Sequence, residues 1–326
     1  MQFPDRIACL LCVVATAAAL LGGADTRAQA YPSKPIRLIV PLAPGGGMDT
    51  VARGVALKIG ERLGQTVVVD NRGGGGGTIG AETVAHAAPD GYTLIMMSAT
   101  SVIHPIMYQA RYDPIRDFAP ISQVTTQPYV IIVHPAVPAQ TAAELVSYAK
   151  ANPKKLSYAS SGSGSLIHLT GELFKLVTGA PMVHIPYKGI GAAYPDLISG
   201  QIQLTFASII SALPQIRVQR VRALAVTSAK RTPSLPELPT VAETVAPGFD
   251  VTQWYGLYAP AGTPMPVVQR LNQEVVAALQ LAEVIARLTN DGAEPVGSSP
   301  QQFAAHIKAD HAKWARVIKE ARIRGD

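Results

Sequence analysis

Residues 36–63 read IRLIVPLAPGGGMDTVARGVALKIGERL, and this stretch decides the fold class. An apolar run at 36–41 is followed by a glycine-rich turn and then by a helical pattern from about Asp49 to Leu63. The same order returns in apolar runs at 66–70 and 93–97, with glycines and a short helical pattern between them. Alternating strands and helices predict an α/β domain with a largely parallel sheet.

A second alternation of strand and helix patterns begins near Val130. Strand patterns occur at 129–135, 156–160, 183–187 and 202–206, and helical patterns occur at 141–151, 165–178 and 189–199. Because the second series repeats the first, we expect an α/β fold of two similar lobes with a ligand cleft between them. No low-complexity linker separates the two series, so we expect the chain to cross between the lobes at least twice.

The C-terminal third supplies further elements. Strand patterns at 222–227 and 254–260 are followed by a helical stretch at 264–288 and by a last helix. In the last helix one stripe carries the apolar side chains of Phe303, Ile307, Trp314 and Ile318, which predicts packing on a lobe. The expected boundaries are residues 31–126 plus 226–326 for lobe I and residues 127–225 for lobe II.

Composition excludes several classes of protein. Of the 326 residues, 48% are apolar and 15% are charged, which excludes a highly charged disordered chain. The formal net charge is +6, from 28 Lys and Arg against 22 Asp and Glu, but no run of five or more like charges occurs. The bases of the last helix are typical of a solvated face, and no nucleic acid partner is expected.

The first thirty residues have the pattern of a secretory signal peptide. A short polar start with Arg6 leads into an apolar stretch at 7–21, and Ala28-Gln29-Ala30 forms an A-x-A cleavage site. We expect cleavage after Ala30 and a periplasmic mature protein. Cleavage would remove Cys9 and Cys12, the two cysteines of the chain, which suits an oxidising compartment.

Three loops at predicted strand ends are rich in Gly, Ser and Thr. They cover residues 41–49, 98–104 and 160–168. Glycine lets backbone N–H groups approach a ligand closely, and the helix that follows each loop directs its unsatisfied N–H donors toward an anion. Two such loops facing each other across a cleft would hold a carboxylate. The alternative is that Asp49 and Ser165 simply cap helices.

Other chemistries lack their motifs. Residues 75–80 formally match G-x-G-x-x-G, but five consecutive glycines produce that pattern by chance and no acidic residue stands about 20 residues further on. The serine loop lacks the spacing of G-x-S-x-G, so we interpret Ser163 as a hydrogen-bond donor rather than a nucleophile. No H-E-x-x-H occurs among the seven histidines. We therefore expect no cofactor, no metal and no catalytic residue.

Three single residues have both a binding and a structural interpretation. His168 falls in the first turn of a helix that opens from the serine loop, where it could contact a ligand or serve packing. Lys188 could place a cation at the cleft or be an exposed lysine beside a turn glycine. Trp254, like its neighbour Tyr255, could line a pocket or belong to the core.

Several segments in order resemble the Bug/TctC family of extracytoplasmic solute receptors, which serve tripartite tricarboxylate transporters. The resemblance covers nearly all of the mature chain and is carried by YPSKPIRLIVPLAPGGGMD (31–49), VVVDNRGGGGGTIGAETVAHAAPDGYTL (67–94), ELVSYAKANPKKLSYASSGSGSLIHLTGELFK (144–175), VHIPYKGIGAA (183–193), VRALAVTSAKR (221–231) and WYGLYAPAGTP (254–264). It implies a periplasmic-binding-protein-like fold that closes around a small carboxylate and delivers it to membrane components of such a transporter. It also implies a monomer that is not an enzyme.

The resemblance maps the family's binding loops onto Ala43 to Gly47, Ser98 to Ser101, and Ser161 to Ser165 with His168. Together with the loop analysis, it predicts these ligand-binding residues: Ala43, Pro44, Gly45, Gly46, Gly47, Asp49, Thr100, Ser101, Ser161, Gly162, Ser163, Ser165, His168, Lys188, Ser208 and Trp254.

The chain departs from the family pattern at several positions. Leu42 stands where an aromatic residue is common, Met48 replaces a small polar residue, and His104 replaces a frequent asparagine. Ala207 and Ser208 occupy places often filled by an acid and an amide. Without an acid at 207, a ligand amine is disfavoured, and we expect a mono- or dicarboxylate. A receptor for a signalling sensor and an exported enzyme acting on a carboxylate remain the alternative functions.

Overall fold

The computed structural model describes residues 31–42, 44–45, 47–74 and 77–323. The description below concerns the compact unit that begins at Lys34. The predicted signal peptide and cleavage site, with the predicted binding residues Ala43 and Gly46, lie outside the described residues. Among the described residues, no helix is long and apolar enough to cross a membrane.

Lobe one is built on three parallel strands: β1 (Ile36–Val40), β2 (Val67–Asn71) and β3 (Thr93–Ser98). Each is followed by a helix, and these helices are α2 (Gly47–Leu63), α3 (Thr78–Ala85) and α4 (Ala99–Met107). Four of the five residues of β1 are fully or almost fully buried, because the strand lies between β2 and β3 with helices on both sides.

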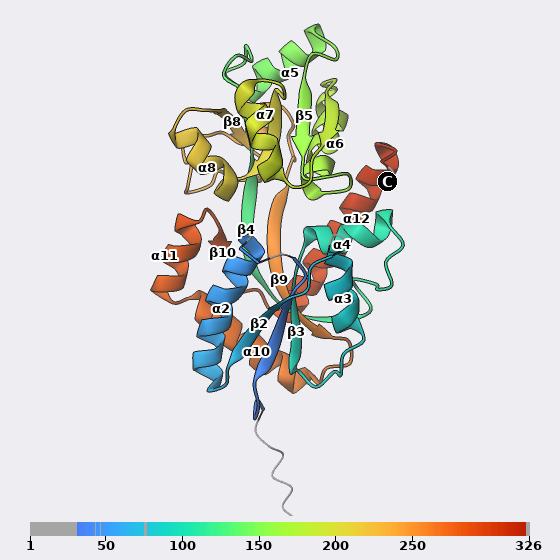
Figure 1. The fold of residues 1–326 in the computed structure, drawn as a ribbon, viewed down its shortest axis with the longest axis vertical. Helices are drawn as coiled ribbons and strands as arrows, with labels where there is room; N and C mark the ends of the chain where they lie inside the picture. The colour runs from blue at the N-terminus through green and yellow to red at the C-terminus, as the bar shows by residue number, and fades with distance from the viewer. Residues whose placement is uncertain (1–30, 43, 46, 75–76, 324–326) are drawn as a thin grey trace, which may run out of the picture. The chain divides into compact units, whose positions relative to one another are not determined.

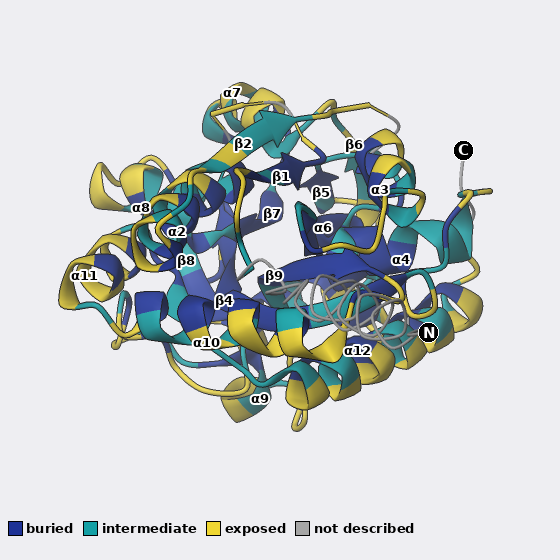
Figure 2. Ribbon diagram, turned by 90° about the horizontal axis from the view of Figure 1, so that it is seen from below, coloured by how far each residue is buried: buried dark blue, intermediate teal, exposed yellow. Residues whose placement is uncertain are grey.

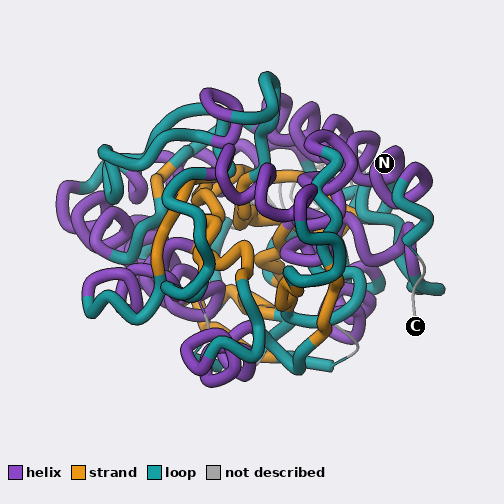
Figure 3. The backbone as a smooth tube through the Cα atoms, turned by 90° about the horizontal axis from the view of Figure 1, so that it is seen from above, coloured by secondary structure: helices purple, strands orange, loops and turns teal. Residues whose placement is uncertain are grey.

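Lobe two repeats this arrangement with the strands β5 (Ser157–Ser160), β6 (Val183–Pro186), β7 (Leu204–Ser208) and β8 (Arg222–Val226). Its helices are α5 (Ala142–Ala151), α6 (Leu166–Thr178), the 3-10 helix η2 (Ile190–Ala193), α7 (Tyr194–Ser199) and α8 (Ile209–Arg217), and the short helix α9 (Val241–Thr244) comes after β8. Strand β5 lies between β6 and β7 and is parallel to both. In both lobes the strands lie at the centre and the helices surround them (Figure 3).

Two long antiparallel strands connect the lobes. Strand β4 (Phe118–Val133) pairs with β9 (Thr252–Pro260) through residues 118–128 and with β7 and β8 through residues 129–133. Figure 1 shows β4 and β9 running side by side between the group that carries α2 and α3 and the group that carries α5 to α8. The lobe boundaries at 126–127 and 225–226 stay a prediction.

The expectation of a largely parallel sheet is wrong for the strands that connect the lobes. Strand β9 is antiparallel to β3, and β4 is antiparallel to β7, β8, β9 and β10 (Glu294–Pro295). The strand at 129–135 is the end of β4, whose first part was missed because Pro120 and a run of Ser, Gln and Thr interrupt its apolar pattern. The predicted stretch at 264–288 is two helices, α10 (Met265–Leu279) and α11 (Ala282–Asn290).

The last helix, α12 (Pro300–Glu320), packs as its apolar stripe predicts. Phe303, Ile307, Trp314 and Ile318 are all buried, while the opposite face is exposed. The helix lies against β4, α4 and α6, and thus contacts elements of both lobes. Figure 2 shows β4 and β9 buried and the outer faces of α10, α11 and α12 exposed.

Candidate ligand-binding site

A cavity of about 570 Å³ lies between the lobes, a size typical of small-molecule sites. It is lined by side chains and glycines from both lobes and from the two connecting strands. The lining residues are Pro41, Leu42, Met48, Gly77, Ser98, Thr100, Ser101, His104, Gln127, Tyr129, Ser161, Ser163, Gly164, Ser165, Leu166, Ile167, Gly189, Ile190, Ser208, Gln253 and Tyr255.

Five α-helices of the described chain begin at this cavity, because each follows the carboxyl end of a parallel strand. Helix α2 follows β1, α3 follows β2, α4 follows β3, α6 follows β5 and α8 follows β7. Their first residues or caps line the cavity, namely Met48 for α2, Gly77 for α3, Thr100 for α4, Leu166 for α6 and Ser208 for α8. The first N–H groups of a helix have no partner within it, so these ends attract an anion.

The predicted site residues divide into two groups. Six of them line the cavity: Thr100, Ser101, Ser161, Ser163, Ser165 and Ser208. Eight others do not appear in its lining, and these are Pro44, Gly45, Gly47, Asp49, Gly162, His168, Lys188 and Trp254. The structure therefore brings the predicted hydroxyl groups of both lobes together.

The serine loop between β5 and α6 places its hydroxyls through local turns. Gly162 and Gly164 have φ angles of 126° and 73°, which L side chains rarely adopt, so glycine is required for this path. Ser165 is the N-cap of α6, and its Oγ accepts a hydrogen bond of 3.2 Å from the N–H of His168. Ser163 and Ser165 therefore line the cavity at the start of a helix.

His168 supports this loop from behind. The residue is 8% exposed, and its Nδ1 accepts a hydrogen bond of 3.0 Å from the N–H of Gly164. The ring stacks on that of His184 with centroids 3.8 Å apart and planes inclined by 6°. Between the two interpretations of the sequence, the geometry favours a structural histidine that positions the serine loop.

Asp49 organises the glycine loop in the same indirect way. Its Oδ2 accepts hydrogen bonds from the N–H of Gly45 at 2.9 Å and from Arg53 Nε at 3.0 Å. Its Oδ1 accepts one from Asn71 Nδ2 at 3.0 Å, and the same amide donates to the carbonyl of Leu42 at 3.1 Å. Burial alone would raise the pKa of Asp49, but these hydrogen bonds outweigh it and the pKa is lowered. The carboxylate thus stays ionised and holds the loop.

Gly47 has little space for a side chain. A Cβ atom there would lie 3.3 Å from the hydroxyl of Tyr255 and 3.9 Å from Cδ1 of Ile210 in lobe two. The start of α2 therefore approaches both a connecting strand and the opposite lobe. A side chain at this position would require the Tyr255 hydroxyl to move by a few tenths of an ångström.

Two other predicted residues lie away from the lining. Trp254 is 1% exposed, donates a hydrogen bond of 2.9 Å from Nε1 to Asp310 Oδ2, and packs edge-on against Phe303. It belongs to the core because side chains alternate along β9, so its neighbours Gln253 and Tyr255 face the cavity instead. Lys188 is exposed, which agrees with the interpretation as a surface lysine beside a turn glycine.

Three cavity residues on the connecting strands were missed from the sequence. Gln127 and Tyr129 come from β4 and Gln253 comes from β9, where Tyr255, one of the two possible pocket residues, also lines the cavity. The signal was present as Gln-x-Tyr in both strands, QPY at 127–129 and QWY at 253–255. This pattern does not by itself indicate a binding site, since polar and aromatic residues alternate in many strands.

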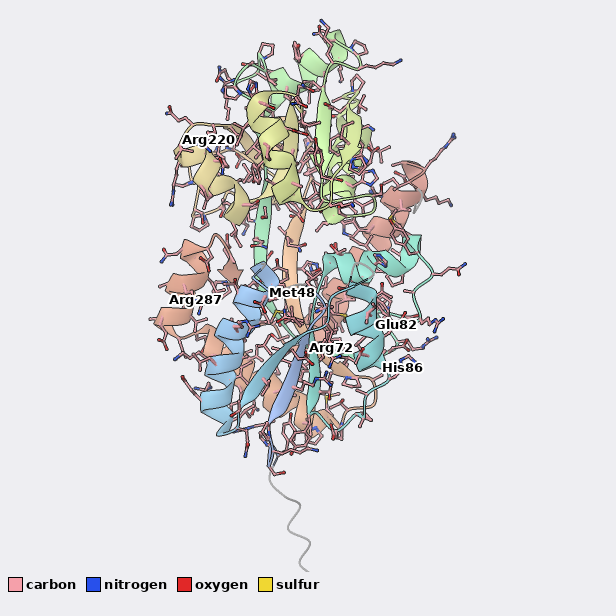
Figure 4. The ribbon with its side chains drawn as sticks, in the orientation of Figure 1. Met48, Arg72, Glu82, His86, Arg220 and Arg287 are labelled. Carbon is pink, nitrogen blue, oxygen red and sulfur yellow. The ribbon has the colours of Figure 1, made fainter. Side chains whose placement is uncertain are left out.

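The lining carries no formal charge among the residues that the structure describes, which include no Asp, Glu, Lys or Arg there. Burial lowers the pKa of His104, so its imidazole is neutral at neutral pH. Figure 4 labels Met48, which lines the cavity, whereas the charged residues labelled with it, among them Arg72, Glu82 and Arg220, are not part of the lining. Hydroxyl and N–H donors with helix ends can hold a carboxylate in such a site.

Residues 51–323 match the family model described as tripartite tricarboxylate transporter family receptor, TctC. The chain belongs to this receptor family. BugT of Bordetella pertussis is similar to the receptor, with 36% identity over 315 residues that cover 95% of this chain and 97% of BugT.

Two solved structures from Rhodopseudomonas palustris are also similar to the receptor. Rpa4515 with adipate has a TM-score of 0.81 and 38% identity, covering 90% of this chain and 99% of Rpa4515. MatC with bound malate has a TM-score of 0.76 and 33% identity, covering 88% of this chain and 100% of MatC. The periplasmic-binding-protein-like fold, with two α/β lobes and a cleft between them, is confirmed.

Proposed function

We propose that this receptor captures a small mono- or dicarboxylate in the periplasm and delivers it to the membrane components of a tripartite tricarboxylate-type transporter. The observation that carries the proposal is the meeting of five helix N-termini at a cavity whose described lining is uncharged. A helix end carries about half a positive elementary charge, so five such ends favour an anion without any lysine or arginine.

The ligand carboxylate would bind to the serine loop and the start of α6. There the hydroxyls of Ser161, Ser163 and Ser165 line the cavity beside Leu166 and Ile167, whose N–H groups belong to the first turn of the helix. Thr100 and Ser101 supply the same kinds of donor from lobe one. Donors on both lobes would draw the lobes together around the anion, which removes the ligand from water.

The dicarboxylates named with the two similar structures, adipate for Rpa4515 and malate for MatC, support this ligand class. An ammonium group of an amino acid would lack a carboxylate partner in the described lining, and burying an unpaired charge is costly. The cavity is therefore better suited to an acid without an amine.

We further propose that the receptor is a monomer without catalytic activity. The described hydrogen bonds of the site show no pairing of Ser163 Oγ with a histidine or a carboxylate, although a serine nucleophile needs such a base. The function would then be capture and release of an unchanged molecule. Delivery would require a mature protein that has lost residues 1–30 on export.

The test is thermal unfolding of the mature chain, residues 31–326, with a panel of mono-, di- and tricarboxylates and acidic amino acids. The protein is first unfolded and refolded to remove any copurified ligand. A ligand at a hundredfold excess over its Kd adds about 2.7 kcal/mol to the free energy of unfolding. We expect a clear rise in Tm with at least one mono- or dicarboxylate, and no rise with any would contradict the proposal.

Turnover and processing are tested separately. NMR of the released ligand should show the same carboxylate that was added, whereas a new product would support the enzyme alternative. The intact mass of the protein recovered from the periplasm should correspond to a chain that begins at Tyr31. A mass that includes residues 1–30 would contradict the proposed export.

A further inference from the structure

Two glutamines face each other across the connecting strands at the cavity. Gln127 of β4 and Gln253 of β9 are directly paired in the antiparallel register, so their side chains share one face. Both line the cavity, and Gln127 is 1% exposed. They come from the strands that join the lobes and belong to neither of the loops that provide hydroxyl groups.

The amide oxygens of this pair are buried acceptors that the protein itself does not satisfy. Oε1 of Gln127 and Oε1 of Gln253 have no hydrogen-bond partner among the described residues. A buried carbonyl oxygen without a partner costs free energy, and most buried polar atoms in native proteins have one. Both oxygens belong to paired side chains that line one cavity, which points to a ligand group that donates hydrogen bonds to them.

Tyr255 determines which way the amides point. Hydrogen bonds from the side chains of Gln253 and Gln127 act on its hydroxyl and oppose the rise in its pKa that burial causes. An amide stabilises a phenolate by donating an N–H group, which agrees with the amide oxygens being the atoms that lack a partner. The oxygens are consequently left for a donor from elsewhere.

The chemistry of the subsite restricts the ligand. An ionised carboxylate only accepts hydrogen bonds and cannot satisfy an amide oxygen. An ammonium group would donate, but the described lining holds no acidic side chain to pair with it. A hydroxyl group donates a hydrogen bond without a charge and therefore fits both conditions.

We propose that Gln127 and Gln253 form a subsite that accepts a hydrogen bond from a ligand hydroxyl, so that this receptor selects hydroxycarboxylates over the same acids without the hydroxyl. The inference rests on the proposed function, since it takes the ligand to be a carboxylate held at the other end by the serine loop. The glutamine subsite adds recognition of the ligand hydroxyl, the group by which a hydroxycarboxylate differs from the same acid without it.

The test compares matched pairs of acids by isothermal titration calorimetry on the refolded mature chain. The pairs are malate with succinate, 2-hydroxyglutarate with glutarate, and 3-hydroxybutyrate with butyrate, with each hydroxy acid tested as both stereoisomers. We expect one stereoisomer of at least one hydroxy acid to bind about tenfold or more tightly than its partner.

Two variants locate the preference at the glutamines. Gln127→Met and Gln253→Met each keep the length of the side chain and remove the amide oxygen. Either variant should reduce the preference to about twofold or less while the acid without the hydroxyl keeps its affinity within about threefold. The matched control is Thr125→Val, which removes another buried, unpartnered oxygen of β4 that is outside the described lining. It should leave the preference intact.

Each other outcome overturns the inference in a recognisable way. Equal binding of every pair by the wild type would refute the hydroxyl subsite and leave carboxylate capture standing. An equal loss of affinity for both members of a pair in the variants would assign the glutamines to a bridging water or to the fold. Binding of no acid at all would refute the proposed function together with this inference. Circular dichroism of both variants verifies that they are folded.

Discussion

The phenol of Tyr108 donates a hydrogen bond of 3.1 Å to the main-chain carbonyl oxygen of Ser163. Tyr108 follows α4 in lobe one, and Ser163 belongs to the serine loop of lobe two, so the bond bridges the cleft beside the cavity. Gly164 makes the approach possible, because a Cβ atom there would lie 3.1 Å from both the Tyr108 hydroxyl and the Met107 sulfur. The loop that is proposed to hold the ligand is thus also a point of contact between the lobes.

Tyr108→Phe should weaken ligand binding without unfolding the protein. The variant keeps the ring that stacks on His104, with centroids 4.4 Å apart, and loses only the hydroxyl. A typical hydrogen bond contributes about 0.5–1.5 kcal/mol, so Kd measured by calorimetry should rise about two- to tenfold. Tyr187→Phe is the control, since it removes a bond of 2.6 Å to Asp196 within lobe two. An equal effect of both variants would show that the bridge has no special role.

Ser163→Ala and Ser165→Ala should separate binding from helix capping. Ser163 lines the cavity, and losing a hydrogen bond to a charged ligand costs about 1.5–3 kcal/mol, or about tenfold or more in affinity, with Tm unchanged. Ser165 also caps α6, so its loss should lower the free energy of unfolding by about 1 kcal/mol. Calorimetry and urea denaturation of the two variants distinguish these effects. A normal affinity of Ser163→Ala for every verified ligand would remove the loop from the site.

Asp49 gives the receptor a dependence on pH that a single substitution should reduce. Its folded-state pKa lies below the ordinary 3.8, so its contribution to stability is complete above that value and is lost as the pH falls through the lowered pKa. Wild type should therefore be more stable than Asp49→Asn at pH 7, with the difference shrinking below about pH 4. Urea denaturation at several pH values measures this difference.

Glu243 provides the control for the effect of Asp49 on ligand affinity. Glu243 has a lowered pKa beside Arg231 and is exposed, far along the chain from the glycine loop. Glu243→Gln should leave ligand affinity unchanged, whereas Asp49→Asn should weaken it because the loop loses its bond to Gly45. If the difference in stability between wild type and Asp49→Asn stayed constant with pH, the assigned role of the Asp49 charge would be contradicted.

Gly256→Ala should destabilise the contact between β9 and α12. A Cβ atom at Gly256 would lie 2.0 Å from Cζ of Phe303, whose ring is completely buried. Overpacking of this kind costs about 1–3 kcal/mol in the free energy of unfolding. Gly191→Ala is the matched control, because nothing lies within 4 Å of a Cβ atom there and an exposed substitution changes stability by about 0.5 kcal/mol or less. Equal unfolding midpoints in urea would contradict the close packing of α12.

The local sequence determined most of the individual elements. The strands β1, β2, β3, β5 and β7, and the helices α2, α5, α6 and α12, lie within a few residues of their predicted positions. Their apolar periodicity acts over neighbouring residues, and glycines and N-caps mark their ends. The hydroxyl residues of the site could be predicted for the same reason, because a loop at the carboxyl end of a parallel strand faces the crevice.

Tertiary structure alone decided which residues of the connecting strands line the cavity together with those loops. Gln127 and Gln253 are distant in sequence and meet only because β4 and β9 pair in antiparallel register across both lobes. The same pairing places Trp254 in the core and its neighbours Gln253 and Tyr255 at the cavity. A shift of the strand register by one residue would exchange these two faces. Asp49 and His168 belong to the predicted loops, yet both are buried and hold those loops from outside the lining. Local pattern specifies which elements form, whereas packing between distant strands decides which side chains line the cavity.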